Sequence, residues 1–194
     1  MKTDSPERER PIINDCPAWL QADLPRLVSV DVETSGPNPH DFALLSIGAC
    51  TLVEPRQTFY VELQPTTMRV EQRAMSIHQL DLNRLSKTGL PPHEALQRFS
   101  DWLMKMIPSE MPPLFLGFNA PFDWMFVCDY FHRFLGKNPF GHAALDIKSF
   151  YMALRAVPWS ETSMAAITKK NLRHNALEDA CDQAQIFLRL IRNF

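Results

Sequence analysis

The stretch Leu27-Val28-Ser29-Val30-Asp31-Val32-Glu33 places two carboxylates at the end of an apolar, strand-like run. Because alternate residues of a strand share one face, Asp31 and Glu33 point the same way, about 6.6 Å apart, while the valines cover the other face. Two like charges held this close beside an apolar sheet require either a bound proton or a cation between them, and a divalent metal is the sharper interpretation. Taken alone, a D-x-E pattern is more typical of solvated residues at a strand edge, so other motifs must decide.

The bulk composition indicates one globular domain. With 194 residues and 45% hydrophobic content, the chain has the size of a single domain with its own core. Residues 1–24 mix charges and prolines without a sustained period, so we expect an N-terminal extension followed by a domain over residues 25–194. The first ten residues are charged with no apolar run behind them, and no segment approaches about 20 apolar residues. We therefore expect a cytoplasmic protein without a signal peptide, a transmembrane helix or a membrane partner.

The four cysteines predict neither a zinc site nor a disulfide framework. Cys16, Cys50, Cys128 and Cys181 show no C-x-x-C spacing, and the last three fall within apolar stretches. We expect these three to be reduced thiols in the core.

The charge balance argues against a protein that coats nucleic acid. The net charge is -2 and the isoelectric point is near 6.3, whereas nonspecific affinity for nucleic acid comes mainly from neutralised phosphates. A local contact remains compatible with this composition. The short basic run of Lys169, Lys170 and Arg173 is either such a contact or a solvated loop, and charge runs of this length favour the loop.

Hydrophobic periodicity after the first strand predicts a succession of strands and helices. Short apolar runs bounded by turn residues predict strands over 44–53, 57–63, 114–118 and 143–146. Apolar residues at helical spacing predict helices over 68–78, over 91–107, over 121–135, before Pro158 and after Asn175. Three leading strands followed by alternating helices and strands give an α/β fold with a mixed sheet covered by helices.

Polar residues at the ends of these elements are expected to converge. Ligands of α/β folds bind outside the carboxyl ends of the strands, where Asp31, Glu33 and Asn119 fall. Asp123 lies in the first turn of its helix, where a carboxylate also complements the helix dipole. Asp179 lies off the apolar stripe of the last helix. These positions predict one acidic site at an edge of the sheet.

Three blocks of sequence match one enzyme family in their order and spacing. The blocks are Asp31-Val32-Glu33-Thr34, Asn119-Ala120-Pro121-Phe122-Asp123 and His174-Asn175-Ala176-Leu177-Glu178-Asp179-Ala180. Together they resemble the DEDDh 3'-5' exonucleases, a group that includes the proofreading subunit of bacterial replicative DNA polymerase and ribonuclease T. The resemblance covers about residues 26 to 193. It departs from the family pattern at Phe118, where a His often precedes the Asn, and at Gln79, where Gly often follows Ile-His.

The resemblance implies a ribonuclease H-like three-layer fold, with a central mixed five-stranded sheet flanked by helices. It also implies that catalysis depends on Asp31, Glu33, Asp123, His174 and Asp179. The four carboxylates would hold two divalent cations, Mg²⁺ or Mn²⁺, which prefer oxygen ligands and suit phosphodiester hydrolysis. The resemblance implies that Asp31 bridges the two ions, that Glu33 and Asp179 hold the first, and that Asp123 reaches the second through water. His174 would be the general base that deprotonates the attacking water.

We expect four further residues to contact the substrate. Thr34 would donate to the terminal nucleotide, and Phe122 or His78 would stack on or wedge the last base. Asn119 is expected beside them, at the end of its strand. For Phe122, packing in the core is the alternative.

These inferences predict a metal-dependent 3'-5' exonuclease that acts on single-stranded 3' ends of DNA or RNA and releases nucleoside 5'-monophosphates. We expect it to work as a monomer or a homodimer. The alternative is a noncatalytic nucleic-acid-binding module on the same fold, which the loss of one of the five residues would indicate; all five are present. The choice between DNA and RNA stays open, because no residue identifies how a 2'-hydroxyl would be met.

Overall fold

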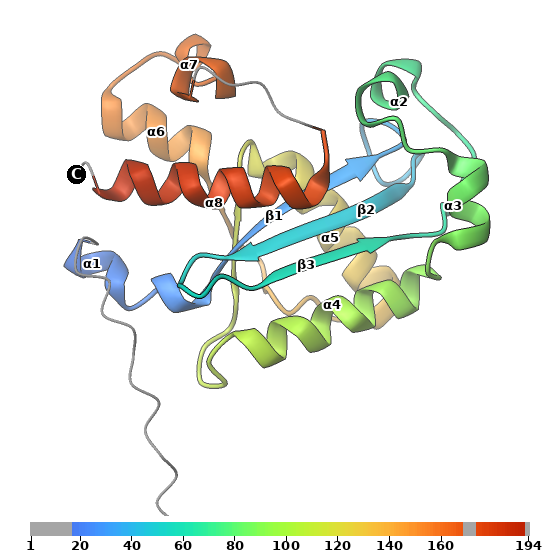
Figure 1. Ribbon diagram of the computed structural model, residues 1–194, viewed down its shortest axis with the longest axis horizontal. Coiled ribbons are helices and arrows are strands. Elements are labelled where there is room, and N and C mark those ends of the chain that lie inside the picture. The colour runs from blue at the N-terminus through green and yellow to red at the C-terminus, as the bar shows by residue number, and fades with distance from the viewer. Residues whose placement is uncertain (1–16, 169–173, 193–194) are drawn as a thin grey trace, which may run out of the picture.

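A five-stranded mixed sheet forms the centre of the protein (Figure 1). The structure is a computed structural model that describes residues 17–168 and 174–192. The strands follow the order β3-β2-β1-β4-β5, with β1, β2 and β3 antiparallel to one another in turn and β4 and β5 parallel to β1. Their bounds are β1 Leu27–Thr34, β2 Leu44–Thr51, β3 Thr58–Glu62, β4 Leu114–Gly117 and β5 Ala144–Asp146. The predicted α/β architecture is confirmed.

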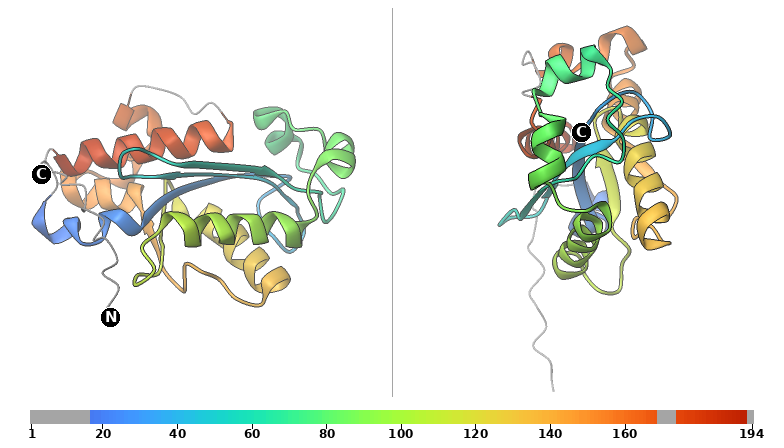
Figure 2. Two further views of the ribbon diagram at one scale, coloured as in Figure 1. Left: turned by 60° about the horizontal axis from the view of Figure 1, so that its bottom comes forward. Right: turned by 90° about the vertical axis from the view of Figure 1, so that its right-hand side faces the viewer.

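Helices cover both faces of this sheet, as Figure 2 shows. The longer ones are α4 Pro92–Met106, α5 Ala120–Leu135, α6 Ile147–Arg155 and α8 Ala176–Arg192. The shorter ones are α1 Ala18–Gln21, α2 Gln72–His78, α3 Leu82–Thr88 and α7 Met164–Thr168, with 3₁₀ helices at Leu24–Arg26 and Trp159–Glu161. Helices α4 and α5 lie on one face, and α8 with α6 lies on the other. Each helix in the described ranges falls short of the length and hydrophobicity that a membrane span requires.

The two faces of β1 belong to two different cores, because successive side chains of a strand point to opposite sides. Val28, Val30 and Val32 are buried against α4 and α5. Leu27 lies on the opposite face, in a core completed by Phe187 and its neighbours on α8. Asp31 and Glu33 share the Leu27 face and therefore point toward α8.

Gly48 allows α8 to approach the sheet closely enough to meet these carboxylates. It pairs with Asp31 in the β1–β2 register. A Cβ at this position would lie 2.1 Å from the carbonyl carbon of Ala176 and 2.3 Å from the nitrogen of Leu177. Only a residue without a side chain fits here, so the start of α8 rests directly on the backbone of β2.

Three local features differ from the sequence-based expectation. The helix expected over 68–78 begins only at Gln72, because the preceding residue Glu71 donates its N–H to the carbonyl of Ser35 at 2.7 Å and stays extended. Helix α3 was not predicted; Asp81 caps it, and Leu82 and Leu85 are buried beneath it. Helix α7 was not predicted either, since five residues carry too little periodicity.

The end of the expected N-terminal extension packs against the domain. Leu20 and Leu24 are buried in the core under α8. Residues 1–16 lie outside the described part of the chain, so the boundary at residue 24 stays a prediction. The three predicted core thiols are free, but only Cys50 is buried, whereas Cys128 and Cys181 are partly exposed. Cys16 falls outside the described residues.

Candidate active site

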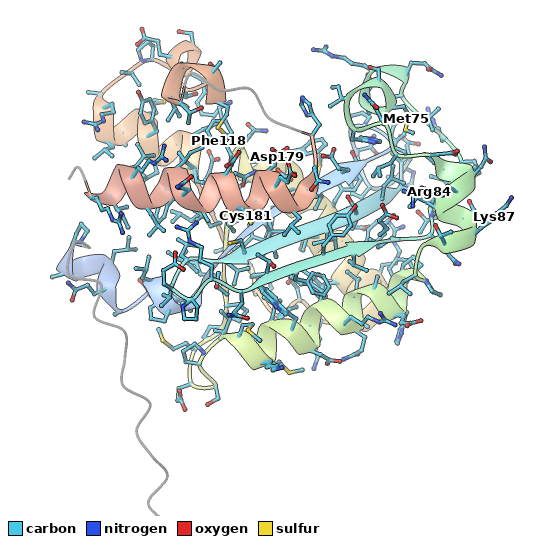
Figure 3. The ribbon with its side chains drawn as sticks, viewed as in Figure 1. Met75, Arg84, Lys87, Phe118, Asp179 and Cys181 are labelled. Atoms are coloured by element: carbon cyan, nitrogen blue, oxygen red, sulfur yellow. The ribbon has the colours of Figure 1, made fainter. Side chains whose placement is uncertain are left out.

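Strand β1 and helix α8 bring three carboxylates together at one end of the sheet. Asp31 and Glu33 project from the α8 side of β1. Asp179 lies near the start of α8, where Figure 3 labels it. One carboxylate oxygen from each residue lies within 4.8 Å of those from the other two. Glu33 and Asp179 are 9% and 2% exposed, while Asp31 is partly exposed. Three oxygen donors thus converge on a space of the size that one cation requires.

Asp123 reaches the same strand from α5. β4 pairs with β1 only as far as Ser29, so the backbone of β1 beyond that point has no neighbouring strand on this side. The buried carboxylate of Asp123 takes that place, and its Oδ1 accepts the N–H of Val32 at 3.0 Å. The interaction with the helix dipole is therefore not the whole role of Asp123, because its carboxylate also connects α5 to β1, the strand that carries Asp31 and Glu33.

The concentration of negative charge is visible in the pKa values of these groups. Burial raises the pKa of Glu33 to about 8, and the charges of Asp179 and Asp123 add to the rise. Burial also raises the pKa of Asp123 to about 8, against the hydrogen bond from Val32, which lowers it. For Asp31 the pKa is raised well above the usual value by burial and then by the charges of Asp123 and Glu33. Such a site favours a bound cation, whose charge would let the carboxylates ionise.

The donor set fits a hard divalent cation. Asp31, Glu33 and Asp179 supply only oxygen ligands, which Mg²⁺ and Mn²⁺ prefer. No cysteine or histidine is among them, so the set does not resemble a structural zinc site.

His174 lies immediately before α8, where its backbone is bound to Asp179. Its N–H donates to Oδ2 of Asp179 at 2.9 Å, and its φ of 56° is left-handed. Asn175 is the predicted N-cap, and its Oδ1 accepts the N–H of Glu178 at 3.1 Å. One carboxylate thus positions the backbone of the predicted general base while belonging to the acidic cluster.

A cleft of about 380 Å³ opens over this cluster. All five predicted catalytic residues line it: Asp31, Glu33, Asp123, His174 and Asp179. Phe122 and Asn119 line it as well. One cavity therefore brings together residues of all three sequence blocks. The most distant of them, Asp31 and Asp179, are 148 positions apart in the chain.

The comparisons with known proteins show which family the chain belongs to. The model of the 3'-5' exoribonuclease Rv2179c-like domain family matches residues 26–191. The chain belongs to this family. It is 42% identical over 173 residues to the 3'-5' DNA exonuclease Cap18 of Escherichia coli, covering 87% of this chain and 92% of that protein. It is 25% identical over 184 residues to ribonuclease T of Buchnera aphidicola subsp. Baizongia pistaciae, covering 86% and 84%.

A solved structure shows the same fold. The nuclease domain of 3'hExo, a DEDDh family member bound to rAMP, matches with a TM-score of 0.69 at 16% identity, covering 86% of this chain and 92% of that one. The predicted ribonuclease H-like fold and the resemblance to DEDDh exonucleases are confirmed. This member of the family is a 3'-5' exonuclease, and the noncatalytic alternative is set aside.

The four expected substrate contacts of the exonuclease fall into two groups. Asn119 and the half-buried Phe122 line the cleft, and the ring of Phe122 also lies 5.5 Å from that of Phe126, so it is in contact with the core. Thr34 and His78 are absent from the described lining of the cleft. They contact each other instead, with Nε2 of His78 3.0 Å from the carbonyl of Thr34. Their substrate roles stay predictions.

Gln183 is a site residue that the sequence interpretation missed. Its Nε2 donates to Oδ1 of Asp31 at 2.6 Å, and its Oε1 accepts the N–H of Phe118 at 3.0 Å. The side chain is 1% exposed. The sequence did contain a signal for this residue. Gln183 is four residues after Asp179, so on a helix its amide lies on the same face as the Asp179 carboxylate. Its two hydrogen bonds connect α8 to Asp31 on β1 and to Phe118, the residue after β4.

The basic run of the sequence cannot be placed in this site. Lys169, Lys170 and Arg173 lie outside the described residues. Their role as substrate guides stays a prediction.

Proposed function

We propose that this exonuclease removes nucleotides from single-stranded 3' ends and releases nucleoside 5'-monophosphates. The observation that carries this proposal is the convergence of Asp31, Glu33 and Asp179 within 4.8 Å, in a cleft that Asp123 and His174 also line. We further propose that the protein acts in the cytoplasm, as a monomer or a homodimer.

We propose that the four carboxylates hold two divalent cations, Mg²⁺ or Mn²⁺. Asp31, Glu33 and Asp179 would hold one cation, and Asp31 with Asp123 would hold the other. When bound, such ions neutralise the phosphate, lower the pKa of a bound water and stabilise the leaving oxygen. Gln183 keeps Asp31 oriented through its hydrogen bond to Oδ1, as residues behind a metal ligand commonly do.

His174 would accept the proton of the attacking water. The neutral imidazole of a histidine has a ring nitrogen that can accept a proton from water, which suits a general base. The hydrogen bond from its backbone to Asp179 places the residue at the rim of the cleft, on the same turn as a proposed metal ligand. Phe122, in the wall of the cleft, would contact the terminal base through its ring.

Single-stranded DNA is the first substrate we propose. The support is the 42% identity to a protein named a DNA exonuclease, over 92% of that protein's length. The family name, which refers to an exoribonuclease, supports RNA as the second candidate.

Matched DNA and RNA oligonucleotides test this proposal directly. Each would carry a 5' label and either a free or a phosphorylated 3' end, and would be incubated with Mg²⁺, Mn²⁺ or EDTA. We expect stepwise shortening from the free 3' end with Mg²⁺ or Mn²⁺, nucleoside 5'-monophosphates as products, and no cleavage in EDTA. Cleavage of a circular single strand would indicate an endonuclease, and full turnover in EDTA would contradict the metal requirement.

A further inference from the structure

Lys148 places a positive charge at the wall of the acidic cleft, on the first turn of α6. Asp146 caps this helix by accepting the N–H of Ser149 at 3.0 Å. Its other oxygen accepts the N–H of Ala120 at 3.0 Å, which joins the start of α6 to the start of α5. This connection places Lys148 beside Asn119, and both residues line the cleft. The position of the ammonium therefore follows from the fold and from its capping carboxylate.

The partners of the Lys148 ammonium are neutral. Its Nζ lies 3.4 Å from Oδ1 of Asn119 and 4.0 Å from the ring centroid of Trp159. Within the described ranges it forms no ion pair with a carboxylate. An amide oxygen and an aromatic face hold a cation in place without cancelling its charge. The charge is thus directed at the cleft and remains available to an anion.

Trp159 adds an aromatic surface next to Lys148, beside the residues that line the cleft. It belongs to the 3₁₀ helix Trp159–Glu161, and the buried Thr162 fastens this turn by donating its hydroxyl to the carbonyl of Trp159 at 2.8 Å. The indole is 52% exposed although its backbone is anchored. A tryptophan presented in this way offers a face on which a nucleobase can stack.

A nucleic-acid strand that enters this cleft meets an acidic site, where each carboxylate charge that no proton or cation neutralises repels its phosphates. A fixed, unneutralised cation on the wall offsets that repulsion, and a neighbouring aromatic face holds a base without regard to sequence. We propose that Lys148, Asn119 and Trp159 form a subsite for the single strand next to the scissile bond, in which Lys148 binds a backbone phosphate and Trp159 stacks on a base. This inference rests on the proposed function, because it assigns the subsite to the same single-stranded substrate.

Binding measurements separate this subsite from the metal site. The affinity for a labelled single-stranded oligonucleotide would be followed by fluorescence anisotropy in EDTA, where no turnover is expected, between about 50 and 200 mM salt. Lys148→Met should weaken binding roughly 3- to 10-fold and reduce the salt slope by about 0.7, the value for one phosphate on a single strand. Lys148→Arg should restore both. Trp159→Ala should weaken binding and leave the salt slope unchanged.

Two controls make the result specific. Lys87→Met changes an exposed lysine of α3 that is absent from the described lining of the cleft (Figure 3), and it should leave affinity and salt slope unchanged. Mn²⁺ affinity of Lys148→Met, measured by calorimetry, should equal that of the wild type, which shows that the acidic cluster is intact. In turnover assays Lys148→Met should raise KM more than it lowers kcat.

The outcomes distinguish this inference from the proposed function. If the wild type shortens single strands while Lys148→Met keeps the wild-type salt slope, the subsite is wrong and the proposed function stands. If the wild type neither binds nor shortens a single strand, the subsite and the proposed function are both wrong. A loss of Mn²⁺ affinity in Lys148→Met would instead assign the lysine to the support of the carboxylates and overturn the phosphate contact.

Discussion

The two faces of β1 differ in what they contribute, although they alternate along one strand. Toward α4 and α5, Val28, Val30 and Val32 pack into a core rich in aromatic rings. Toward α8, Asp31 and Glu33 meet Asp179 in a cluster of three carboxylates, of which Glu33 and Asp179 are buried and Asp31 is partly exposed. The first face buries apolar surface, which stabilises the fold, whereas the second holds like charges close together, which destabilises it.

This contrast shows how an exonuclease of this size can maintain an unfavourable site. Raised pKa values at Glu33 and Asp123 mean that the folded, metal-free protein opposes ionisation of its own carboxylates. The apolar face of the same strand offsets that cost. Because the side-chain period of a strand is two, a slip of one residue in register would exchange the two faces. The pairing of Asp31 with Gly48 holds the register at the point where the site needs it.

The largest effect is expected on the acidic face. Asp179→Ala should lower turnover by a factor on the order of 10³ or more, because it deletes a proposed metal ligand worth several kcal/mol in the transition state. Mn²⁺ affinity, measured by calorimetry, should fall with it. A variant that loses activity but binds Mn²⁺ as tightly as the wild type would remove Asp179 from the metal site.

The next largest effect is expected at His174. Its substitution should impair proton transfer without impairing metal binding, although His174 and Asp179 belong to the same sequence block. His174→Ala should lower the rate by roughly 10² to 10⁴ while Mn²⁺ still binds, and the variant should be more active at raised pH, where hydroxide replaces the base. His174→Asn is the matched control for the backbone, since Asn tolerates the left-handed conformation seen here. Loss of Mn²⁺ binding as complete as in Asp179→Ala would show that His174 is a ligand or a structural residue.

Substitutions on the apolar side of the sheet should change the stability of the protein and leave metal binding unchanged. Phe99→Ala removes a fully buried ring of α4 and should lower the free energy of unfolding by about 3 to 5 kcal/mol, measured with denaturant. The described part of α4 contributes no residue to the lining of the cleft, so the remaining folded protein should bind Mn²⁺ normally. Weakened Mn²⁺ binding by the folded fraction would mean that the two faces are coupled.

Gln183 tests how far the acidic face depends on orientation. Gln183→Met keeps the size of the side chain but removes both hydrogen bonds, to Asp31 and from Phe118. We expect a roughly 10- to 100-fold loss of metal affinity or activity, as for other residues that orient metal ligands. Gln185→Met, an exposed position on the same helix, is the control and should behave as the wild type. Equal behaviour of the two variants would leave Gln183 with a packing role only.

The last prediction concerns the pH dependence of stability. The pKa values of Glu33 and Asp123 are about 8 in the folded protein, against ordinary values of 4.5 and 3.8. The folded state therefore binds more protons than the unfolded state between about pH 4 and pH 8, and its stability falls as the pH rises through that window. In EDTA the Tm should decrease as the pH rises from about 5.5 to about 8. Adding Mg²⁺ should raise the Tm most at about pH 8, where the carboxylates ionise most readily. Glu33→Gln should flatten the dependence; an unchanged profile would contradict the proposed protonation.

Local sequence patterns were sufficient for most of the fold and for the identity of the proposed catalytic residues. The five strands and the helices α4, α5 and α8 were predicted because period and turn residues are encoded by neighbours in the chain. The blocks around Asp31, Asp123 and Asp179 were recognisable because each carries its residues within a few positions. Helix α3 escaped prediction, since its short stripe of leucines is stabilised by burial against another part of the chain.

Tertiary structure alone decided which of these groups touch and how they ionise. Gln183 meets Asp31 across 152 positions of sequence, and Lys148 lies beside Asn119 only because Asp146 joins two helices. No local pattern reports such contacts. The raised pKa of Glu33 likewise depends on desolvation and on charges from α5 and α8, which exist only once the chain has folded. The sequence by itself determined which residues are proposed to carry the chemistry. The packing of α8 and α5 against β1 determined the environment of those residues, because charge interactions depend on distance and burial rather than on order in the chain.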